Sequence, residues 1–317
     1  MQTYIHNCCS ILYLPVKINY GRNLHLHIIF NFYHFIGLSN LDRLQFQLLT
    51  KLKKYNLLGT ILIAPEGING GLSGTEENIY LFKAVIDQLV GDEYIHFIGQ
   101  TSTAPFSKQR VKIKSEIIKM YKDCLTCTKG KYLSPQEWHD FIQQENTVIF
   151  DTRNVQETGI GTFEGSIVPP IKTFSEFPQY FLKNFSHLPK NTAIGMYCTG
   201  GVRCEKTTAF LVTLGYTQIH HLKGGILAYL RDIPQAISKW QGGCYVFDRR
   251  VVIDASLKET NYVQCFACRQ PLSYEDQQKE QYIPGISCAS CVNELSINRD
   301  KLIDRELQKL NLLSKDL

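Results

Sequence analysis

The segment that most constrains the fold of this chain is residues 192–211, TAIGMYCTGGVRCEKTTAFL. An apolar, strand-like run leads to Cys198, a turn with two glycines follows, and a helical pattern starts at about Glu205. A strand that enters a helix through a glycine turn is typical of parallel α/β sheets, in which functional loops follow the carboxyl ends of strands. The sequence therefore predicts an α/β domain in which Cys198 lies at the carboxyl end of a strand, where functional loops of such sheets are found.

The loop after this strand consists of Cys198, Thr199, Gly200, Gly201, Val202 and Arg203. Backbone N–H groups of a glycine turn beside a helix N-terminus stabilise a thiolate, a persulfide or a bound oxyanion, and the two glycines let the backbone wrap closely. Arg203 adds a guanidinium that stays protonated. A lone cysteine is more often a small buried hydrophobe, but these neighbours favour a reactive thiol. Only four residues separate Cys198 from Arg203, which argues against a cysteine phosphatase, whose loop must surround a phosphate.

Two further features accompany this loop. Cys204 is interpreted as core packing rather than as a disulfide partner of Cys198. Upstream, the motif DTRNVQETGIGTFEGSIVPP resembles the second signature of rhodanese domains, with Asp151, Arg153 and Glu157 at the matching places. Their charged groups are suited to charge-assisted hydrogen bonds. We therefore expect these three side chains to brace the active-site loop rather than to take part in catalysis.

The length of 317 residues fits two or three domains, and 44% hydrophobic residues suffice for folded cores. Residues 28–120 have the β-α-β-β-α-β order of a ferredoxin-like domain. Residues 121–255 alternate short helices with apolar strands, as expected for a mostly parallel sheet. Residues 1–27 show no periodicity and are expected to be an N-terminal extension, whereas residues 256–317 form a Cys-rich tail. The predicted fold class is a combination of α+β and α/β domains.

Two helices of the first domain can be delimited from their patterns. Apolar residues at helical spacing predict one over residues 41–55, with Ser39 or Asn40 as its cap. A second is predicted over residues 76–90, with Thr75 as its cap. We expect both helices to pack against the sheet of this domain.

The cysteines suggest metal and thiol chemistry. Of the eleven, eight stand in four close pairs, which suits a reducing compartment better than a disulfide framework. The pairs Cys265/Cys268 and Cys288/Cys291, nineteen residues apart, have the spacing of a structural zinc site with four thiolates. A set of redox-active dithiols is the alternative. The pair Cys124/Cys127 has no second pair nearby and is interpreted as part of a linker.

Other classes are disfavoured by what the sequence lacks. No apolar run approaches the roughly 20 residues of a membrane span, and the N-terminus makes a poor signal peptide, so we expect a soluble, cytoplasmic protein. Neither a dinucleotide-binding fingerprint nor a His/carboxylate iron triad is recognisable. The thiol loop is therefore the one recognisable motif in the sequence at which redox chemistry could take place.

Taken together, the motifs APEGING, YLSPQEW, FDTRN, MYCTGGVRCEK and HLKGGI resemble the rhodanese-domain tRNA uridine hydroxylase family (TrhO), over about residues 28–295. Single rhodanese motifs occur in many sulfurtransferases. The order of a ferredoxin-like (acylphosphatase-like) domain, a CTGGxRCEK rhodanese loop and a Cys-rich tail is specific to that family. The resemblance implies an oxidoreductase that uses molecular oxygen to convert the wobble uridine of certain tRNAs to 5-hydroxyuridine, with Cys198 as its essential residue.

Two other functions stay open at this point. A sulfurtransferase would carry a persulfide on Cys198, and the loop alone fits this chemistry equally well. A rhodanese domain can also be a non-enzymatic binding module, although such modules usually lack the Cys or the Arg. For the hydroxylase, we hypothesise that Cys198 adds to C6 of the uracil and makes C5 electron-rich enough to react with oxygen.

A tRNA substrate would find positive charge in one part of the chain. Residues 108–131 contain eight basic and two acidic side chains, whereas the whole chain has a net charge of +5. Lys108, Arg110, Lys112 and Lys114 stand at alternate positions, so in a strand all four project from one face. Such a stripe suits a tRNA backbone, and an edge strand protected from aggregation by its lysines is the alternative.

Recognition of an unpaired base also requires stacking groups. Exposed aromatic side chains near Cys198 are therefore expected. Tyr197, Phe163 and Tyr229 are the candidates, and each of them suits the hydrophobic core at least as well.

Overall fold

The structure is a computed structural model that describes residues 26–120 and 129–293. Two sequence-based expectations lie wholly or largely outside the described residues: the N-terminal extension over residues 1–27 and the linker role of Cys124/Cys127. Within the described ranges, no helix is both long and apolar enough to cross a membrane.

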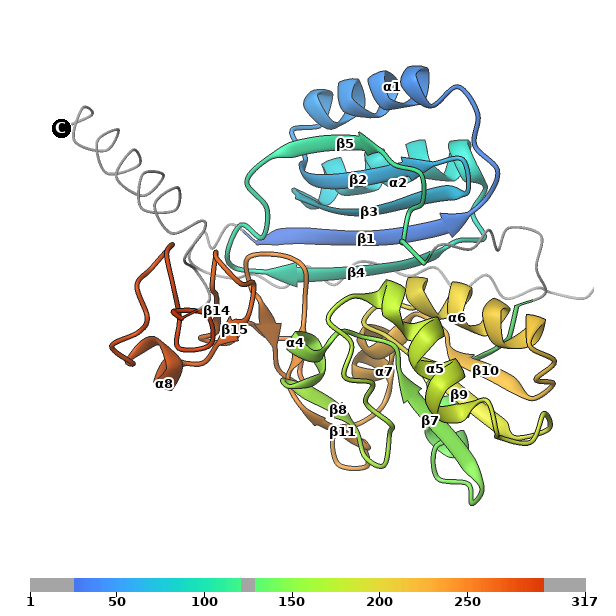
Figure 1. The fold of residues 1–317 in the computed structure, drawn as a ribbon. Helices are drawn as coiled ribbons and strands as arrows, with labels where there is room; N and C mark the ends of the chain where they lie inside the picture. Colours follow the sequence, from blue (N-terminus) through green and yellow to red (C-terminus); the bar gives the residue numbers. More distant parts are fainter. Residues whose placement is uncertain (1–25, 121–128, 294–317) are drawn as a thin grey trace, which may run out of the picture.

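The N-terminal domain is a five-stranded sheet with two helices (Figure 1). Its elements are β1 (His27–Phe35), α1 (Leu41–Lys54), β2 (Leu58–Ala64), β3 (Gly67–Gly74), α2 (Glu76–Val90), β4 (Ile95–Thr101) and β5 (Gln109–Ile113). The first six elements form the predicted ferredoxin-like unit. The strand order is β4-β1-β3-β2-β5, and β5 is a fifth strand that runs parallel to β2 at the edge of the sheet. Strand β5 is an addition to the predicted β-α-β-β-α-β order, and it lies at the opposite edge of the sheet from β4.

The two helices cover one face of this sheet. Helix α2 has the predicted bounds, and its Thr75 side chain caps the Asn78 amide at 3.4 Å. Helix α1 ends at Lys54, one residue before the predicted end, and its N-cap Asn40 makes no side-chain cap bond. Their apolar stripes share one core with alternate residues of β1, including Phe30 and Phe32. The other face of β1, with Tyr33, turns toward the second domain (Figure 1).

The second domain is built on a parallel sheet, as predicted. Its elements are β6 (Lys131–Leu133), α3 (Pro135–Phe141), β7 (Thr147–Asp151), α4 (Val155–Thr158), β8 (Gly161–Phe163), a 3-10 turn (Phe174–Glu176), α5 (Phe177–Phe185), β9 (Ala193–Tyr197), α6 (Val202–Thr213), β10 (Ile219–Leu222) and α7 (Gly225–Asp232). The four main strands have the order β6-β10-β9-β7, and every pair in this sheet is parallel.

Strand β9 lies at the centre of this domain and is buried on both sides. Tyr197 packs into the core on one side, with Trp138 and Phe163. Met196 and Cys198 belong to the core on the other side. Alternation of side chains along a strand explains this division. The strand therefore holds Cys198 at a point fixed from both faces of the sheet.

Between residues 240 and 293, the C-terminal part that the structure describes consists of short strands and one short helix. Strand β11 (Trp240–Gly242) pairs with β8, and the next strands are β12 (Cys244–Tyr245), β13 (Val252–Ile253), β14 (Val263–Gln264) and β15 (Pro271–Leu272), followed by α8 (Tyr274–Gln277). Strands β12 and β13 form one antiparallel pair, and β14 and β15 another. The small core beyond β14 contains Cys265, Cys288, Cys291 and Leu272. Cysteines thus replace most of the apolar side chains that a domain core normally needs.

Candidate active site

The active-site loop joins β9 to α6. Cys198 follows directly after β9, and Gly201 is the N-cap of α6 with φ 100°. The helix begins at Val202, three residues earlier than predicted. Consequently Arg203 lies in the first helical turn, where its backbone N–H has no partner within the helix and can point toward the loop. The positive end of the helix dipole is also directed at the loop.

The sulfur of Cys198 is surrounded by groups that favour its thiolate. The Gly201 amide donates a hydrogen bond to the Cys198 Sγ at 3.1 Å. Burial by itself raises the pKa of this thiol, but a hydrogen bond from Cys204, the Arg203 charge and the amides of Arg203 and Gly201 lower the pKa to about 6. At neutral pH the Cys198 sulfur is therefore mainly the nucleophilic thiolate.

Cys204 has the opposite environment. Its side chain is completely buried, near the Thr152 hydroxyl at 3.8 Å. Burial, the hydrogen bond to Cys198 and the Cys198 charge raise its pKa well above the usual range. Both cysteines are outside any disulfide. Cys204 thus keeps its proton and donates a hydrogen bond to the Cys198 sulfur, a role beyond the predicted core packing.

The guanidinium of Arg203 is held in place by Glu157. Its two terminal nitrogens donate to the two Glu157 carboxylate oxygens at 2.7 and 2.6 Å. Both side chains are buried, and the Thr199 hydroxyl also donates to Glu157 at 3.4 Å. Burial raises the pKa of Glu157, but the Arg203 charge and hydrogen bonds outweigh it and lower this pKa. Because the fork is bidentate, Arg203 cannot rotate away from the loop.

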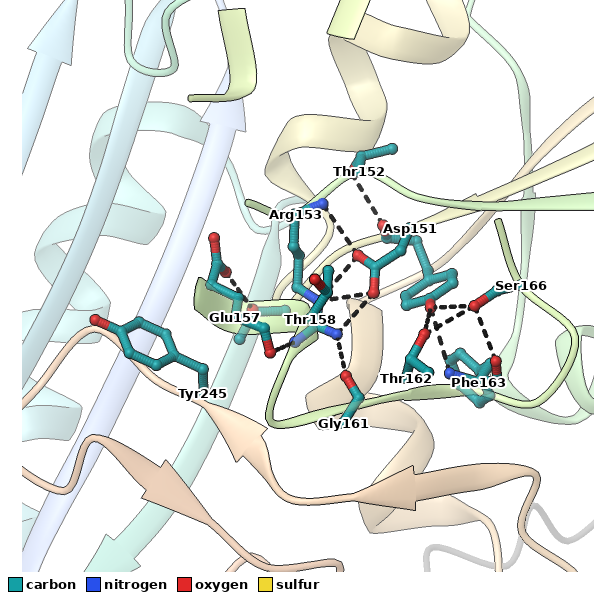
Figure 2. Close-up of polar contacts among 12 residues, drawn as sticks. Asp151, Thr152, Arg153, Glu157, Thr158, Gly161, Thr162, Phe163, Ser166 and Tyr245 are labelled. Carbon is teal, nitrogen blue, oxygen red and sulfur yellow. Dashed lines mark hydrogen bonds and ion pairs between the residues drawn. The ribbon is translucent and has the colours of Figure 1, made fainter. Parts of the chain in front are cut away.

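A second buried ion pair supports the segment that carries Glu157 (Figure 2). Arg153 donates to both oxygens of Asp151, the shortest contact being 2.7 Å, and both side chains are fully buried. Arg153 also donates to the backbone carbonyls of Glu157 and Gly161. The structure thus places Asp151, Arg153 and Glu157 in one network that ends at Arg203, an arrangement suited to the bracing role expected for them.

Two glycines allow the close backbone contacts of this loop. A Cβ at Gly225 would lie 2.4 Å from the Cys198 carbonyl oxygen, which accepts a hydrogen bond from the Ile226 amide. A Cβ at Gly201 would lie 2.8 Å from the Tyr33 hydroxyl. At Gly200, by contrast, φ is not positive and nothing lies within 4 Å of an added Cβ. The expectation that Gly200 permits close wrapping is therefore wrong, and the loop is open to space at this residue.

The two residues after Cys204 contact the N-terminal domain, a contact that no local sequence signal indicates. Glu205 accepts a hydrogen bond from Tyr33 at 3.1 Å and another from Tyr132, and it pairs with Lys129 at 2.9 Å. Lys206 is fully buried and pairs with Glu66 at 2.8 Å and Glu116 at 2.6 Å. The N-terminal part of α6 thus stabilises the Cys198 thiolate and also binds the neighbouring domain.

The basic stripe lies on β5 and its flanks. Lys108, Arg110, Lys112 and Lys114 are exposed, while Val111 between them is buried. The strand register places Lys112 opposite Leu62, Leu62 opposite Asn69, and Asn69 opposite Tyr33. These four residues form one row across the sheet and share a face, the one from which Tyr33 reaches the active-site helix. Lys112 is three strand spacings, roughly 14 Å, from Tyr33 along this row.

The three aromatic candidates for base stacking are in the core. Tyr197 and Tyr229 are completely buried, and Phe163 lies between them in edge-to-face contact with both. The Tyr197 hydroxyl forms hydrogen bonds with the hydroxyls of Thr162 and Ser166. None of these rings can reach a substrate base. All three rings therefore belong to the hydrophobic core, the alternative interpretation for each of them.

The four predicted zinc ligands form one cluster. The thiol sulfurs of Cys265, Cys268, Cys288 and Cys291 all lie within 4.8 Å of one another. Three of their separations are 3.9, 3.6 and 3.8 Å. A tetrahedron with Zn–S bonds of about 2.3 Å has sulfur–sulfur edges of roughly 3.8 Å. The cluster could therefore bind a metal such as zinc, and four thiolates would leave no coordination position for a substrate.

Comparison with protein families agrees with this architecture. Residues 27–117 match the UPF0176 acylphosphatase like domain, and residues 134–232 match the Rhodanese-like domain. The chain thus combines an acylphosphatase-like domain with a rhodanese-like domain that carries the Cys198 loop. This pair of domains, in this order, is the organisation of the rhodanese-domain tRNA uridine hydroxylases that the sequence motifs resemble.

Several of the solved structures similar to this chain are rhodanese-like domains or rhodanese-related proteins. One is the rhodanese-like domain of an Anabaena sp. protein, with 19% identity and a TM-score of 0.29, covering 36% of this chain and 80% of that chain. Another is a rhodanese-like domain protein from Staphylococcus aureus, with 23% identity and a TM-score of 0.26, covering 31% and 90%. A rhodanese-related protein from Thermoplasma volcanium has 19% identity and a TM-score of 0.27, covering 32% and 93%. Their substrates have no bearing on that of this chain at such low similarity.

Proposed function

We propose that this protein hydroxylates the wobble uridine of tRNA to 5-hydroxyuridine, with molecular oxygen as co-substrate and Cys198 as the reactive residue. The observation that carries this proposal is that helix α6 both forms part of the Cys198 loop and contacts the N-terminal domain. The turn that positions Arg203 beside Cys198 continues into Glu205 and Lys206, which hold the N-terminal domain. A rhodanese loop attached in this way to a second domain is suited to a substrate much larger than a small sulfur donor.

The chemistry starts at the Cys198 thiolate. With a pKa of about 6 the sulfur is ionised at neutral pH, and it can add to C6 of a uracil ring, which places electron density on C5. Reaction of C5 with oxygen transfers one oxygen atom to the base. The second oxygen atom leaves as water, and this requires two electrons and two protons from an external two-electron reductant. Loss of the C5 proton together with the thiolate at C6 then restores the C5–C6 double bond of the base.

The basic stripe supports tRNA as the substrate. Arg110 and Lys112 lie on the sheet face that turns toward the active-site helix, at a distance across the sheet that a tRNA stem can bridge. Phosphates bound there would orient the anticodon loop toward Cys198. The alternative role of this stripe, protection of an edge strand, fits the position of β5 as well, so a binding measurement must separate the two.

The deciding experiment is nucleoside mass spectrometry of tRNA from cells that lack the protein and cells that regain it. The wild-type chain should restore 5-hydroxyuridine, Cys198→Ser should not, and Cys244→Ala, which changes a buried cysteine outside the loop, should. With purified protein, a reductant and ¹⁸O₂, the new hydroxyl should carry ¹⁸O. Loss of a thiolated nucleoside instead would identify a sulfurtransferase with a Cys198 persulfide, and no change in any nucleoside would favour a binding module.

A further inference from the structure

Phe247 is an unusually exposed aromatic residue in the turn between β12 and β13. Its side chain is 65% exposed, whereas its sequence neighbours Tyr245 and Val246 are buried. Exposure of a phenyl ring to water costs free energy that burial would recover. Single exposed apolar residues are common on proteins, so the exposure by itself has no functional meaning.

The turn that carries Phe247 is held in one conformation. Asp248 and Arg250 form a buried bidentate ion pair, with contacts of 2.9 and 2.6 Å. The Val246 amide donates to the Val251 carbonyl across the turn at 2.9 Å. The Arg249 amide donates to the Pro105 carbonyl of the N-terminal domain at 3.0 Å. Phe247 is thus exposed on a rigid support, the arrangement that minimises the entropy cost of binding.

The ring of Phe247 lies against the active-site arginine. The Arg203 guanidinium carbon is 5.6 Å from the centre of the ring, and Tyr245 contacts the ring edge to face at 5.2 Å. Arg203 in turn acts on the Cys198 sulfur through its amide and its charge. One exposed aromatic ring therefore stands a single side chain away from the reactive thiolate, beside the loop that is open at Gly200.

We infer that Phe247 is a stacking site for an unpaired RNA base that neighbours the base presented to Cys198. This inference rests on the proposed function. An aromatic ring accepts any base on its open face, and removal of such a ring typically costs about 5- to 150-fold in affinity. Arg203 fixes the ring from within the protein, and exposed Arg249 next to it favours an anionic ligand over an apolar partner surface.

Phe247 and the Cys198 loop would together bind two bases of one single-stranded segment. Bases in an anticodon loop are already unpaired or readily splayed apart, so one can occupy Cys198 while an adjacent one stacks on Phe247. A base in a duplex has both faces covered by its neighbours. Phe247 therefore selects for unpaired RNA, which the phosphate contacts of the basic stripe cannot do.

The test is a binding measurement with the full-length, metal-loaded protein. The probes are a fluorescent anticodon stem-loop with unpaired loop uridines and a fully paired RNA duplex of the same length. Phe247→Leu and Phe247→Ala should weaken stem-loop binding by at least about fivefold and leave duplex binding unchanged, while Phe247→Trp should bind as wild type and show quenched indole fluorescence. The matched control is Phe46→Ala, which removes an exposed ring of α1 on the opposite face of the sheet.

The outcomes separate stacking from other roles. Wild-type affinity of Phe247→Leu for the stem-loop, or an equal loss for stem-loop and duplex, overturns the inference. Thermal unfolding of each variant identifies a folding defect, and in that case the Leu and Trp variants still provide the comparison. Binding does not depend on turnover, so intact stacking without 5-hydroxyuridine would refute only the proposed function. Unchanged binding with normal hydroxylation would refute only the stacking site.

Discussion

The hydroxyl of Tyr33 donates a hydrogen bond to the Glu205 carboxylate at 3.1 Å, although 172 positions separate the two residues in the chain. Tyr33 belongs to β1 of the N-terminal sheet, and Glu205 follows the active-site arginine by two residues. The same hydroxyl lies where a side chain at Gly201 would have to be. The N-terminal domain therefore contributes directly to the shape of the thiolate loop.

Replacement of Lys206 by Met should strongly destabilise the protein. The lysine is fully buried and pairs with Glu66 and Glu116 of the other domain. Its removal leaves these two carboxylates without their shared cation and with little access to water. Loss of one partner of a buried ion pair costs about 3–5 kcal/mol. Urea unfolding measures this cost, and Lys239→Met, which breaks the exposed pair with Glu164, should cost no more than about 1 kcal/mol. Equal stability of the two variants would contradict the role of Lys206.

The two loop glycines should respond differently to alanine. Gly201→Ala places a Cβ at φ 100° and 2.8 Å from the Tyr33 hydroxyl, so we expect a loss of about 1–3 kcal/mol in unfolding free energy. Gly200→Ala meets nothing within 4 Å and should fold as stably as wild type. If substrate enters at this open position, Gly200→Ala should still raise KM for tRNA. Calorimetry and steady-state kinetics of both variants provide the comparison.

The pH dependence of Cys198 should be set in part by Cys204. Because the pKa of Cys198 is lowered to about 6, its thiolate forms as pH rises through 6, and reactivity should be high and flat above pH 7. Cys204→Ala removes a hydrogen bond to that thiolate and should move the midpoint to higher pH, whereas Cys204→Ser keeps a donor and should move it less. Alkylation of Cys198 at a series of pH values, followed by peptide mass spectrometry, gives the midpoints. The same midpoint in all three proteins would exclude this role of Cys204.

Loss of a zinc ion from the four-cysteine cluster should destabilise the C-terminal part of the chain. We expect Cys268→Ser to lose most of the bound zinc, and Cys244→Ala, which changes a buried cysteine outside the cluster, to keep it. Gln264, next to Cys265 of the cluster, donates a hydrogen bond to the Tyr245 hydroxyl at 2.6 Å. Zinc loss should therefore also expose the segment around β12 to protease. Elemental analysis and limited proteolysis measure the two effects, and full zinc content in Cys268→Ser would rule out the four-thiolate site.

The basic stripe should determine the salt dependence of tRNA binding. If Arg110 and Lys112 neutralise phosphates, the double change to Gln should weaken binding and reduce the slope of log Kd against log salt by up to about two. Lys53→Gln changes an exposed lysine of α1 on the opposite face of the sheet and should change neither quantity. If the stripe protects only the edge strand, tRNA affinity stays constant and the double variant aggregates instead.

Local patterns predicted several of the helices and strands, and the cysteine cluster, of this protein well. The Thr75 cap and the apolar spacing after it delimited α2, because these signals act within one helix. The two cysteine pairs predicted the cluster, because its ligands are fixed by short turns. The start of α6 was placed at Glu205 rather than Val202, since a glycine turn can either precede a helix or form its first cap.

Contacts between distant segments could not be derived in the same way. Glu205 and Lys206 look like ordinary surface charges of a helix, and only the docking of the N-terminal sheet reveals why they are buried. The same holds for Phe247, whose significance depends on Arg203 lying beside it. Edge strand β5 was recognised as a strand, but its pairing with β2 is a long-range choice that local alternation leaves open.

The ion pairs of Lys206 also limit how this protein can change during evolution. A rhodanese domain separated from its neighbour would expose Lys206 without its counterions Glu66 and Glu116, and Glu205 would lose the hydrogen bond from Tyr33. A recombination event that replaced either domain would have to replace the matching charges at the same time. We therefore expect the two domains to have been inherited together, with Tyr33, Glu66, Glu205 and Lys206 varying as one group.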